Sequence, residues 1–229
     1  KTIGLIGGMS GESTSVYYQY LNRMARARLG GLHSAELVVW SFDFAQIEAL
    51  QAAGDWDQAT ERMVDAAQRL ERAGASCIVI CTNTMHKMAE AIEAVVDLPL
   101  IHIADATAAA VVKTGVKKPL LLGTRFTMEQ DFYRARLARG YGVEALIPEE
   151  DERADVHNII YDELCQGLIR PESKQRYLEI VASAQRRGAD GVIFGCTEVG
   201  LLIRPEDLSV DAFDTTELHA AAALDFALA

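Results

Sequence analysis

Short apolar runs alternate along the chain with longer stretches in which apolar residues recur every three or four positions. Runs of four to six residues that are mostly apolar predict buried strands, and the three-to-four spacing predicts amphipathic helices. The predicted strands cover residues 2–6, 36–41, 77–81, 99–103, 120–123 and 192–194. The predicted helices cover residues 12–29, 56–72, 84–95, 128–139, 155–166, 172–187 and 217–228. Strands that alternate with helices favour parallel sheets with helices on both faces.

The two halves of the chain resemble each other. Residues 72–83 and 186–197 each read as a helix end, a glycine stop, an apolar strand and then small polar residues, and Thr82 aligns with Cys196. We therefore expect an α/β protein with two pseudo-symmetric domains, each a mainly parallel sheet flanked by helices. The expected domains are 1–104 plus 214–229, which carries Thr82, and 105–213, which carries Cys196. Ligands of such sheets bind beyond the carboxyl ends of strands, which predicts an active site in the cleft between the domains.

Composition and charge narrow the class of protein. Half of the 229 residues are hydrophobic, which is ample for a packed core, and the net charge is −11 with a pI near 4.9. So acidic a surface repels phosphate and anionic lipid, which argues against nucleic acid or membranes as partners. The longest apolar runs have strand length, and no leader pattern precedes the first strand, so we expect a cytoplasmic protein with four reduced cysteines.

Two polar motifs follow predicted strands and could carry chemistry. Cys196, Thr197 and Glu198 lie at the start of an expected helix, where backbone N–H groups lower the pKa of a thiol, and Glu198 could manage a proton. Thr82, Asn83 and Thr84 occupy the matching place in the first half. Together they offer neutral donors that suit a bound carboxylate. The alternative for both motifs is a plain helix cap, with Cys196 as a small buried hydrophobe.

Other motifs give little support to a cofactor or a metal. The glycines at 4, 7, 8 and 11 miss the G-x-G-x-x-G spacing, and no acidic residue follows at the distance that a dinucleotide site requires. The five histidines do not form a metal-binding pattern, so no metal site is predicted. His86 lies about one helical turn beyond Thr82, where it could face the same pocket or serve as a cap. The acidic run 149–152 is expected to be a solvated loop.

The motifs resemble those of the cofactor-independent aspartate/glutamate racemases, and most closely the bacterial L-aspartate/glutamate-specific subgroup. The matching stretches are residues 3–10, 82–86, 122–125, 127–133, 150–153 and 195–198. The resemblance implies two α/β domains around an active site that uses no pyridoxal phosphate, and a homodimer. In a typical member, one cysteine on each face of the substrate Cα exchanges the α-proton. The resemblance also suggests that Met9, Gln51, Thr82, Asn83, Thr84, Thr197 and Glu198 bind the substrate.

This chain departs from the family pattern at one of the two cysteines. The family motif is Cys-Asn-Thr, whereas this chain has Thr82 followed by Asn83 and Thr84. Cys81 stands one residue early, and in a strand its side chain points to the opposite face from Thr82. The predicted catalytic residues are therefore Cys196 as base and Thr82 as proton donor or relay. A threonine is a poor base, so we expect fast α-proton exchange of the L-enantiomer and slower inversion.

Three functions remain open at this stage. The leading one is racemisation of L-aspartate and L-glutamate. A second is another reaction of the same superfamily, either decarboxylation of a malonate or isomerisation of a cis-diacid, which also uses a single activated cysteine. A third is a binding protein for small acids without turnover. Residues 46–48 and 164–166 lack the cations that read the distal carboxylate in some aspartate racemases, so a neutral amino acid is also a possible substrate.

Overall fold

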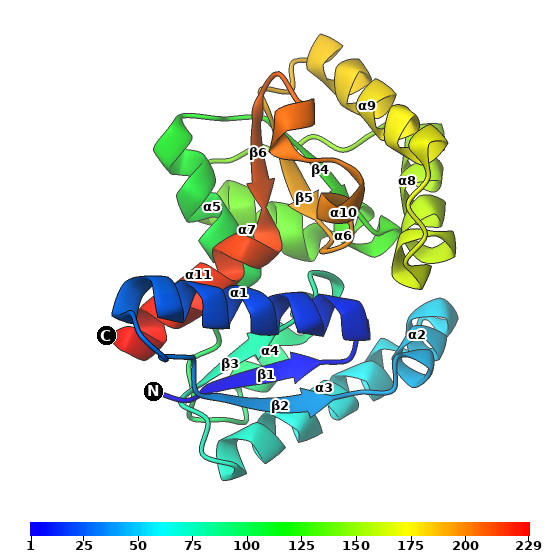
Figure 1. Ribbon diagram of the computed structural model, residues 1–229. Helices are drawn as coiled ribbons and strands as arrows, with labels where there is room; N and C mark the ends of the chain where they lie inside the picture. Colours follow the sequence, from blue (N-terminus) through cyan, green and yellow to red (C-terminus); the bar gives the residue numbers. More distant parts are fainter. The chain divides into compact units, whose positions relative to one another are not determined.

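The computed structural model describes residues 1–229, which divide into two compact units (Figure 1). Unit 1 comprises Lys1–His102 and His219–Ala229, and unit 2 comprises Ile103–Leu218. The first division, between His102 and Ile103, lies at the start of helix α5 (Ile103–Thr114), and the second, between Leu218 and His219, lies within helix α11 (Thr215–Leu228). The domain boundaries predicted from the sequence lie between residues 104 and 105 and between residues 213 and 214. No helix of the chain is both long enough and apolar enough to cross a bilayer.

Unit 1 is built around a parallel sheet with the strand order β2-β1-β3. Its elements are β1 (Ile3–Gly7), α1 (Gly11–Leu29), β2 (Leu37–Ser41), α2 (Phe44–Ala53), α3 (Trp56–Arg72), β3 (Cys77–Ile80), the 3-10 helix η1 (Thr84–Met88), α4 (Ala89–Glu93) and most of α11 (Thr215–Leu228). In the parallel register Gly7 pairs with Ser41 and Ile6 pairs with Ile80. The chain segments that follow all three strands therefore emerge at one edge of the sheet.

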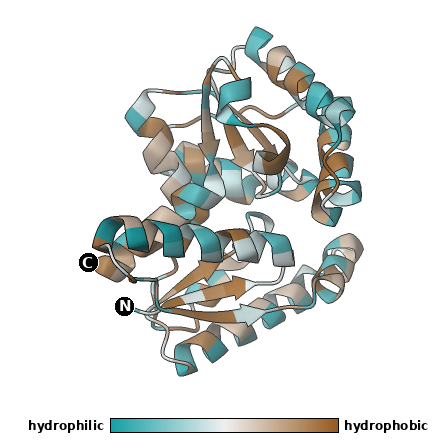
Figure 2. Ribbon diagram, viewed as in Figure 1, coloured by the Kyte–Doolittle hydropathy of each residue, from teal (hydrophilic) through white to brown (hydrophobic).

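Alternate residues of each strand in unit 1 enter different cores, as the pleat of a strand requires. Ile78 and Ile80 pack on one face with apolar residues of α3, whereas Cys77 and Val79 pack on the other with residues of α1 and α11. Figure 2 shows the corresponding hydrophobic strands and mixed helices. Burial on both faces explains why β1 and β3 read as continuous apolar runs rather than as alternating patterns.

Unit 2 repeats this arrangement with the strand order β4-β5-β6, again all parallel. Its elements are α5 (Ile103–Thr114), β4 (Pro119–Gly123), α6 (Arg125–Glu129), α7 (Asp131–Tyr141), α8 (Glu150–Asp162), η2 (Leu164–Gln166), α9 (Pro171–Arg186), β5 (Gly191–Gly195), α10 (Val199–Leu202), η3 (Pro205–Asp207) and β6 (Asp211–Asp214). Leu122 and Phe194 enter the core beside α8 and α9, and Leu121 and Ile193 enter the core beside α5 and α7. The α/β fold class predicted from the sequence is thus confirmed.

Several predicted elements differ from the structure in detail. Residues 99–103 do not form a strand: Leu100 makes a single bridge to Ile78, and helix α5 already begins at Ile103. The helix predicted over 128–139 is interrupted at Gln130, whose backbone is extended, and it ends at Tyr141 with Gly142 as its cap. Helices α2, α5 and α10 and strand β6 are not among the elements predicted from the sequence. Short or weakly amphipathic elements leave little periodic signal.

The acidic run at 149–152 is the start of a helix and not a loop. Glu149 caps α8, and Glu149 and Glu152 form a reciprocal capping box with each other's backbone. Arg187 pairs with Glu149 at 3.0 Å. Carboxylates are favourable in the first turn because the exposed N–H groups there carry partial positive charge. The concentration of acidic residues is therefore a helix-start signal.

Candidate active site

The predicted site residues of unit 1 follow the carboxyl ends of its three strands. Met9 comes after β1, Gln51 lies on α2 after β2, and Thr82–Thr84 follow β3. Because the sheet is parallel, these segments share one edge, and Gln51 Nε2 lies 3.2 Å from the sulfur of Met85 in η1. Gln51 and Met9 are each only 5 % exposed.

Two glycines make this edge of unit 1 compact. A Cβ on Gly7 would lie 2.5 Å from the Thr14 side chain of α1. Gly8 has φ +79°, which disfavours other residues, and a Cβ there would lie 2.3 Å from the carbonyl of Phe42. The Gly8 N–H donates to Thr14 Oγ1 at 2.8 Å. The glycines that suggested a nucleotide loop instead allow β1, α1 and the end of β2 to pack closely.

Cys81 and Thr82 have different surroundings although they are neighbours. Cys81 is fully buried and packs in the apolar cluster that contains Tyr17 of α1 and Ala220 of α11. Burial raises the pKa of the Cys81 thiol strongly. Thr82 is partly exposed, and Asn83 and Thr84, which follow it, are buried. Cys81 therefore has the environment of a core residue.

In unit 2, Cys196, Thr197 and Glu198 follow the carboxyl end of β5. Gly195 precedes Cys196, and a Cβ on Gly195 would lie 2.9 Å from the carbonyl of Leu122, so only glycine lets β4 and β5 approach this closely. The Cys196 thiol donates to Glu198 Oε2 at 2.9 Å. Thr197 Oγ1 accepts a hydrogen bond of 3.3 Å from Thr216 Oγ1, at the start of α11.

The environment of Cys196 raises the pKa of its thiol well above the ordinary value. Burial is the largest cause, followed by the negative charge of Glu198 and the proximity of Cys165. A backbone hydrogen bond from Glu198 lowers this pKa, as expected at a helix start, but burial and the neighbouring groups outweigh it, so the net lowering expected from the sequence is not found. Helix α10 has only four residues, so few aligned peptide dipoles face the thiol, and the adjacent carboxylate favours the protonated form.

Several residues near Cys196 are not among the site residues predicted from the sequence. The hydroxyl groups of Thr215 and Thr216 are buried at the end of β6, where Thr215 Oγ1 donates to the carbonyl of Phe194 at 2.7 Å. Cys165 of η2 raises the pKa of Cys196 and has its own thiol pKa raised to about 12, mainly by burial. A usable signal was present for the threonines, because they follow a strand as Thr82–Thr84 do. Cys165 offered no such signal.

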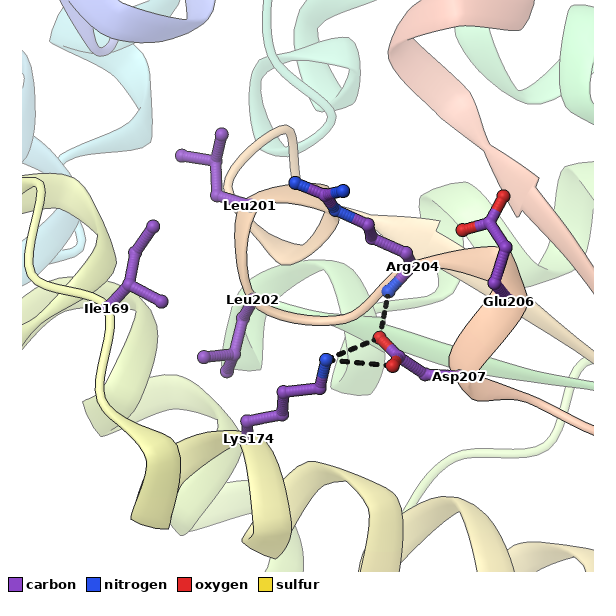
Figure 3. A pocket seen from close by; sticks show the side chains of 7 residues that line it. All are labelled: Ile169, Lys174, Leu201, Leu202, Arg204, Glu206 and Asp207. Carbon is purple, nitrogen blue, oxygen red and sulfur yellow. Dashed lines mark hydrogen bonds and ion pairs between the residues drawn. The ribbon is translucent and has the colours of Figure 1, made fainter.

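A separate pocket of about 640 Å³ lies beside α9 and η3 in unit 2 (Figure 3). Ile169, Leu201 and Leu202 form its apolar part, and Lys174 pairs with Asp207 at 2.7 Å within it. Asp207 also accepts a hydrogen bond from the Arg204 N–H at 2.9 Å. None of the predicted site residues lines this pocket.

Comparisons with known proteins agree with this arrangement. The sequence profile described as Asp/Glu/hydantoin racemase matches residues 6–223. The chain is 52 % identical to a Yersinia pestis protein proposed to be an Asp/Glu racemase, and the two structures superpose with a TM-score of 0.93. It is 35 % identical to an aspartate racemase homologue from Pyrococcus horikoshii OT3, with a TM-score of 0.87. Both matches cover 100 % of each chain. It is 22 % identical over 207 residues to the broad specificity amino-acid racemase RacX of Bacillus subtilis, covering 88 % of this chain and 87 % of that protein.

The shared fold and the matched sequence define an amino-acid racemase, which is an isomerase. The chain belongs to the Asp/Glu/hydantoin racemase family. The resemblance identified from the short motifs is therefore confirmed.

Proposed function

We propose that this enzyme racemises L-aspartate and L-glutamate without a cofactor. Cys196 removes the α-proton of the L-enantiomer, and Thr82 supplies a proton to the opposite face. The observation that supports this most is the 2.9 Å hydrogen bond from the Cys196 thiol to Glu198. A thiol with a raised pKa needs a nearby acceptor before it can act as a base, and Glu198 is that acceptor.

The proton transfers balance over one turnover. The Cys196 proton moves to Glu198, and the thiolate then takes the α-proton, which leaves a carbanion at Cα. The Thr82 hydroxyl protonates the other face while it takes a proton from water, because a free threonine alkoxide is too basic to form near neutral pH. Glu198 then releases its proton and neutralises the hydroxide. The resting thiol and carboxylate are restored, and the product carries one solvent-derived proton.

Uncharged hydrogen-bond donors that follow the strand ends of each unit are suited to binding the carboxylate of an amino acid. We propose that Met9, Gln51, Asn83, Thr84 and Thr197 bind the substrate together with Thr82 and Glu198. N–H and O–H groups can bind a carboxylate without a cation beside the reacting carbon. The similarity to an aspartate racemase homologue supports aspartate as a substrate, and the similarity to a broad specificity racemase supports tolerance of other side chains.

The remaining proposals concern the setting of the enzyme. We propose a homodimer that works in the cytoplasm on free amino acids. The family resemblance supports the dimer. The net charge of −11 argues against partners that are themselves anionic, such as nucleic acid or lipid surfaces.

The decisive experiment is incubation of the purified enzyme with L-aspartate in deuterium oxide, followed by proton NMR and chiral chromatography. We expect loss of the α-proton signal and formation of D-aspartate. Malonates and a cis-diacid are tested in parallel. Turnover of one of these with no exchange of any amino acid would replace the proposal with another reaction. Binding of L-aspartate with no exchange and no turnover would instead define a binding protein.

A further inference from the structure

Three histidines of unit 1 form a buried cluster that the proposed proton transfers do not use. His86 lies in η1, His102 lies just before α5, and His219 lies on α11. The ring centroid of His86 is 4.6 Å from that of His102 and 5.4 Å from that of His219. All three side chains are at least 96 % buried. Segments that are far apart in the sequence thus converge on His86.

Hydrogen bonds define the state of the His219 ring. Its Nε2 lies 2.5 Å from the carbonyl of Ile101, and its Nδ1 lies 2.7 Å from the Tyr17 hydroxyl. Burial lowers the pKa of His219 to about 4, so the ring is neutral near pH 7. A carbonyl oxygen only accepts, so Nε2 carries the proton and Nδ1 accepts from Tyr17. The His219 ring is therefore held in one orientation beside the His86 ring.

His86 makes a direct contact with the main chain of Thr82. Its Nδ1 lies 2.8 Å from the Thr82 carbonyl oxygen. Because the carbonyl has no proton to give, Nδ1 is the donor in this hydrogen bond. The sequence left open whether His86 faces the pocket or caps the turn. In the structure its Nδ1 bonds back to Thr82, two residues beyond the end of β3.

In unit 2, the carbonyl that corresponds to the Thr82 carbonyl accepts its hydrogen bond from a different kind of group. The Cys196 carbonyl accepts a hydrogen bond from the backbone N–H of Val199 at 3.1 Å. The internal repeat aligns Val199 with Met85, and Gly200, which has no side chain, with His86. The Thr82 carbonyl receives no such bond from Met85. In unit 1 the His86 side chain therefore bonds the carbonyl whose counterpart in unit 2 is bonded by a backbone N–H.

We propose that His86 is a positioning residue for inversion, which holds the Thr82 hydroxyl in the direction needed for proton delivery. Threonine is β-branched and has few accessible χ1 values, so the direction of its hydroxyl follows from the orientation of its backbone. Anchoring the Thr82 carbonyl fixes that orientation. This inference rests on the proposed function, in which Thr82 serves inversion and Cys196 serves abstraction from the L-enantiomer.

The test compares two rates in each variant with L-aspartate in deuterium oxide: the formation of D-aspartate and the loss of the α-proton. Loss of the α-proton needs only Cys196, because the thiol can return a solvent deuteron to the same face. His86→Leu removes the donor, and His86→Asn keeps an N–H near the position of Nδ1. Tyr17→Phe is the matched control, since it removes a hydrogen bond from the same cluster and leaves the bond to Thr82 in place.

We expect His86→Leu to lower the ratio of inversion to exchange by about tenfold or more, with exchange within about threefold of the wild type. His86→Asn and Tyr17→Phe should keep the wild-type ratio. An unchanged ratio in His86→Leu, or an equal fall of both rates, overturns the positioning role. If His86→Leu does not fold, His86→Gln, whose amide cannot occupy the Nδ1 position, replaces it under the same criteria. Absence of exchange in the wild type would instead overturn the proposed function.

Discussion

The thiol of Cys196 donates a 2.9 Å hydrogen bond to the carboxylate of Glu198, two positions further along the chain. Glu198 is 3 % exposed, and its charge is one of the causes that raise the pKa of the thiol. The resting pair is therefore a thiol and a carboxylate. The carboxylate opposes the formation of a thiolate, and in the proposed mechanism it also accepts the thiol proton.

Glu198→Gln separates these two effects. An amide carries no charge, so the pKa of the Cys196 thiol should fall. The rate of α-proton exchange increases as the thiol ionises, so this increase should occur at a lower pH. The amide also accepts a proton poorly, so we expect the maximal exchange rate to fall by about 100-fold. The measurement is the pH dependence of kcat/KM for exchange of L-aspartate. Glu163→Gln is the control, because Glu163 bonds Ser173 and is not among the groups that shift Cys196. A shift to higher pH, or the same change in the control, would disprove the role of Glu198.

Replacement of Cys81 should affect stability and leave catalysis unchanged. Cys81 is fully buried in the core between the unit 1 sheet and helices α1 and α11. Cys81→Ala removes one buried atom and should lower the free energy of unfolding by about 1 kcal/mol in a denaturant titration. Racemisation should remain within about twofold of the wild type, whereas Cys196→Ala should abolish it. Loss of exchange in Cys81→Ala would assign the first-half thiol a catalytic role.

The stability of unit 1 should depend on pH through His219. Burial lowers the His219 pKa from the ordinary value of 6.5 to about 4, so between these values the unfolded chain binds a proton that the folded chain does not. Stability is therefore retained above pH 6.5 and lost as the pH falls toward 4, by about 3 kcal/mol in total. The stability difference between the wild type and His219→Gln should change by this amount over that range. The exposed His33, changed to Gln, is the control. A constant difference across the range would contradict the burial of a neutral His219.

The spacing of apolar residues predicted most of the longer helices, and local backbone geometry determined where the shorter elements form. The helix Trp56–Arg72 has the bounds that its apolar spacing indicated. The run at 99–103 forms only a single bridge at Leu100, because the Ile101 carbonyl accepts from the His219 side chain rather than from a strand and α5 begins at Ile103. The strand Asp211–Asp214 has charged ends and only Phe213 in it is buried, so it does not stand out as a continuous apolar run.

The candidate site was predicted from the sequence as a set of positions, without its interactions. The repeat aligned Thr82 with Cys196 because strand ends and glycine stops leave a regular spacing. It could not give the pKa of Cys196, because that depends on burial and on where the Glu198 carboxylate points. Nor could it show the bond from His86 to the Thr82 carbonyl, since donor direction is set by the packing of distant histidines.

Thr82→Cys should give the enzyme a second base. A thiolate is accessible near neutral pH and a threonine alkoxide is not, so we expect the variant to exchange the α-proton of D-aspartate at least about tenfold faster than the wild type. Thr82→Ser keeps a hydroxyl and should show no such gain. The measurement is the initial rate of deuterium incorporation into D-aspartate. Equal rates in all three proteins would mean that residue 82 does not face the α-proton of the D-enantiomer.

The asymmetry between thiol and hydroxyl is tested most directly by following deuterium incorporation into L-aspartate and D-aspartate separately, with the wild-type enzyme and equal substrate concentrations. The equilibrium between enantiomers is unaffected by any catalyst, so only the exchange rates can differ. We expect the L-enantiomer to exchange its α-proton faster than D-aspartate forms, and the D-enantiomer to exchange slowly. Equal exchange of both enantiomers would contradict it.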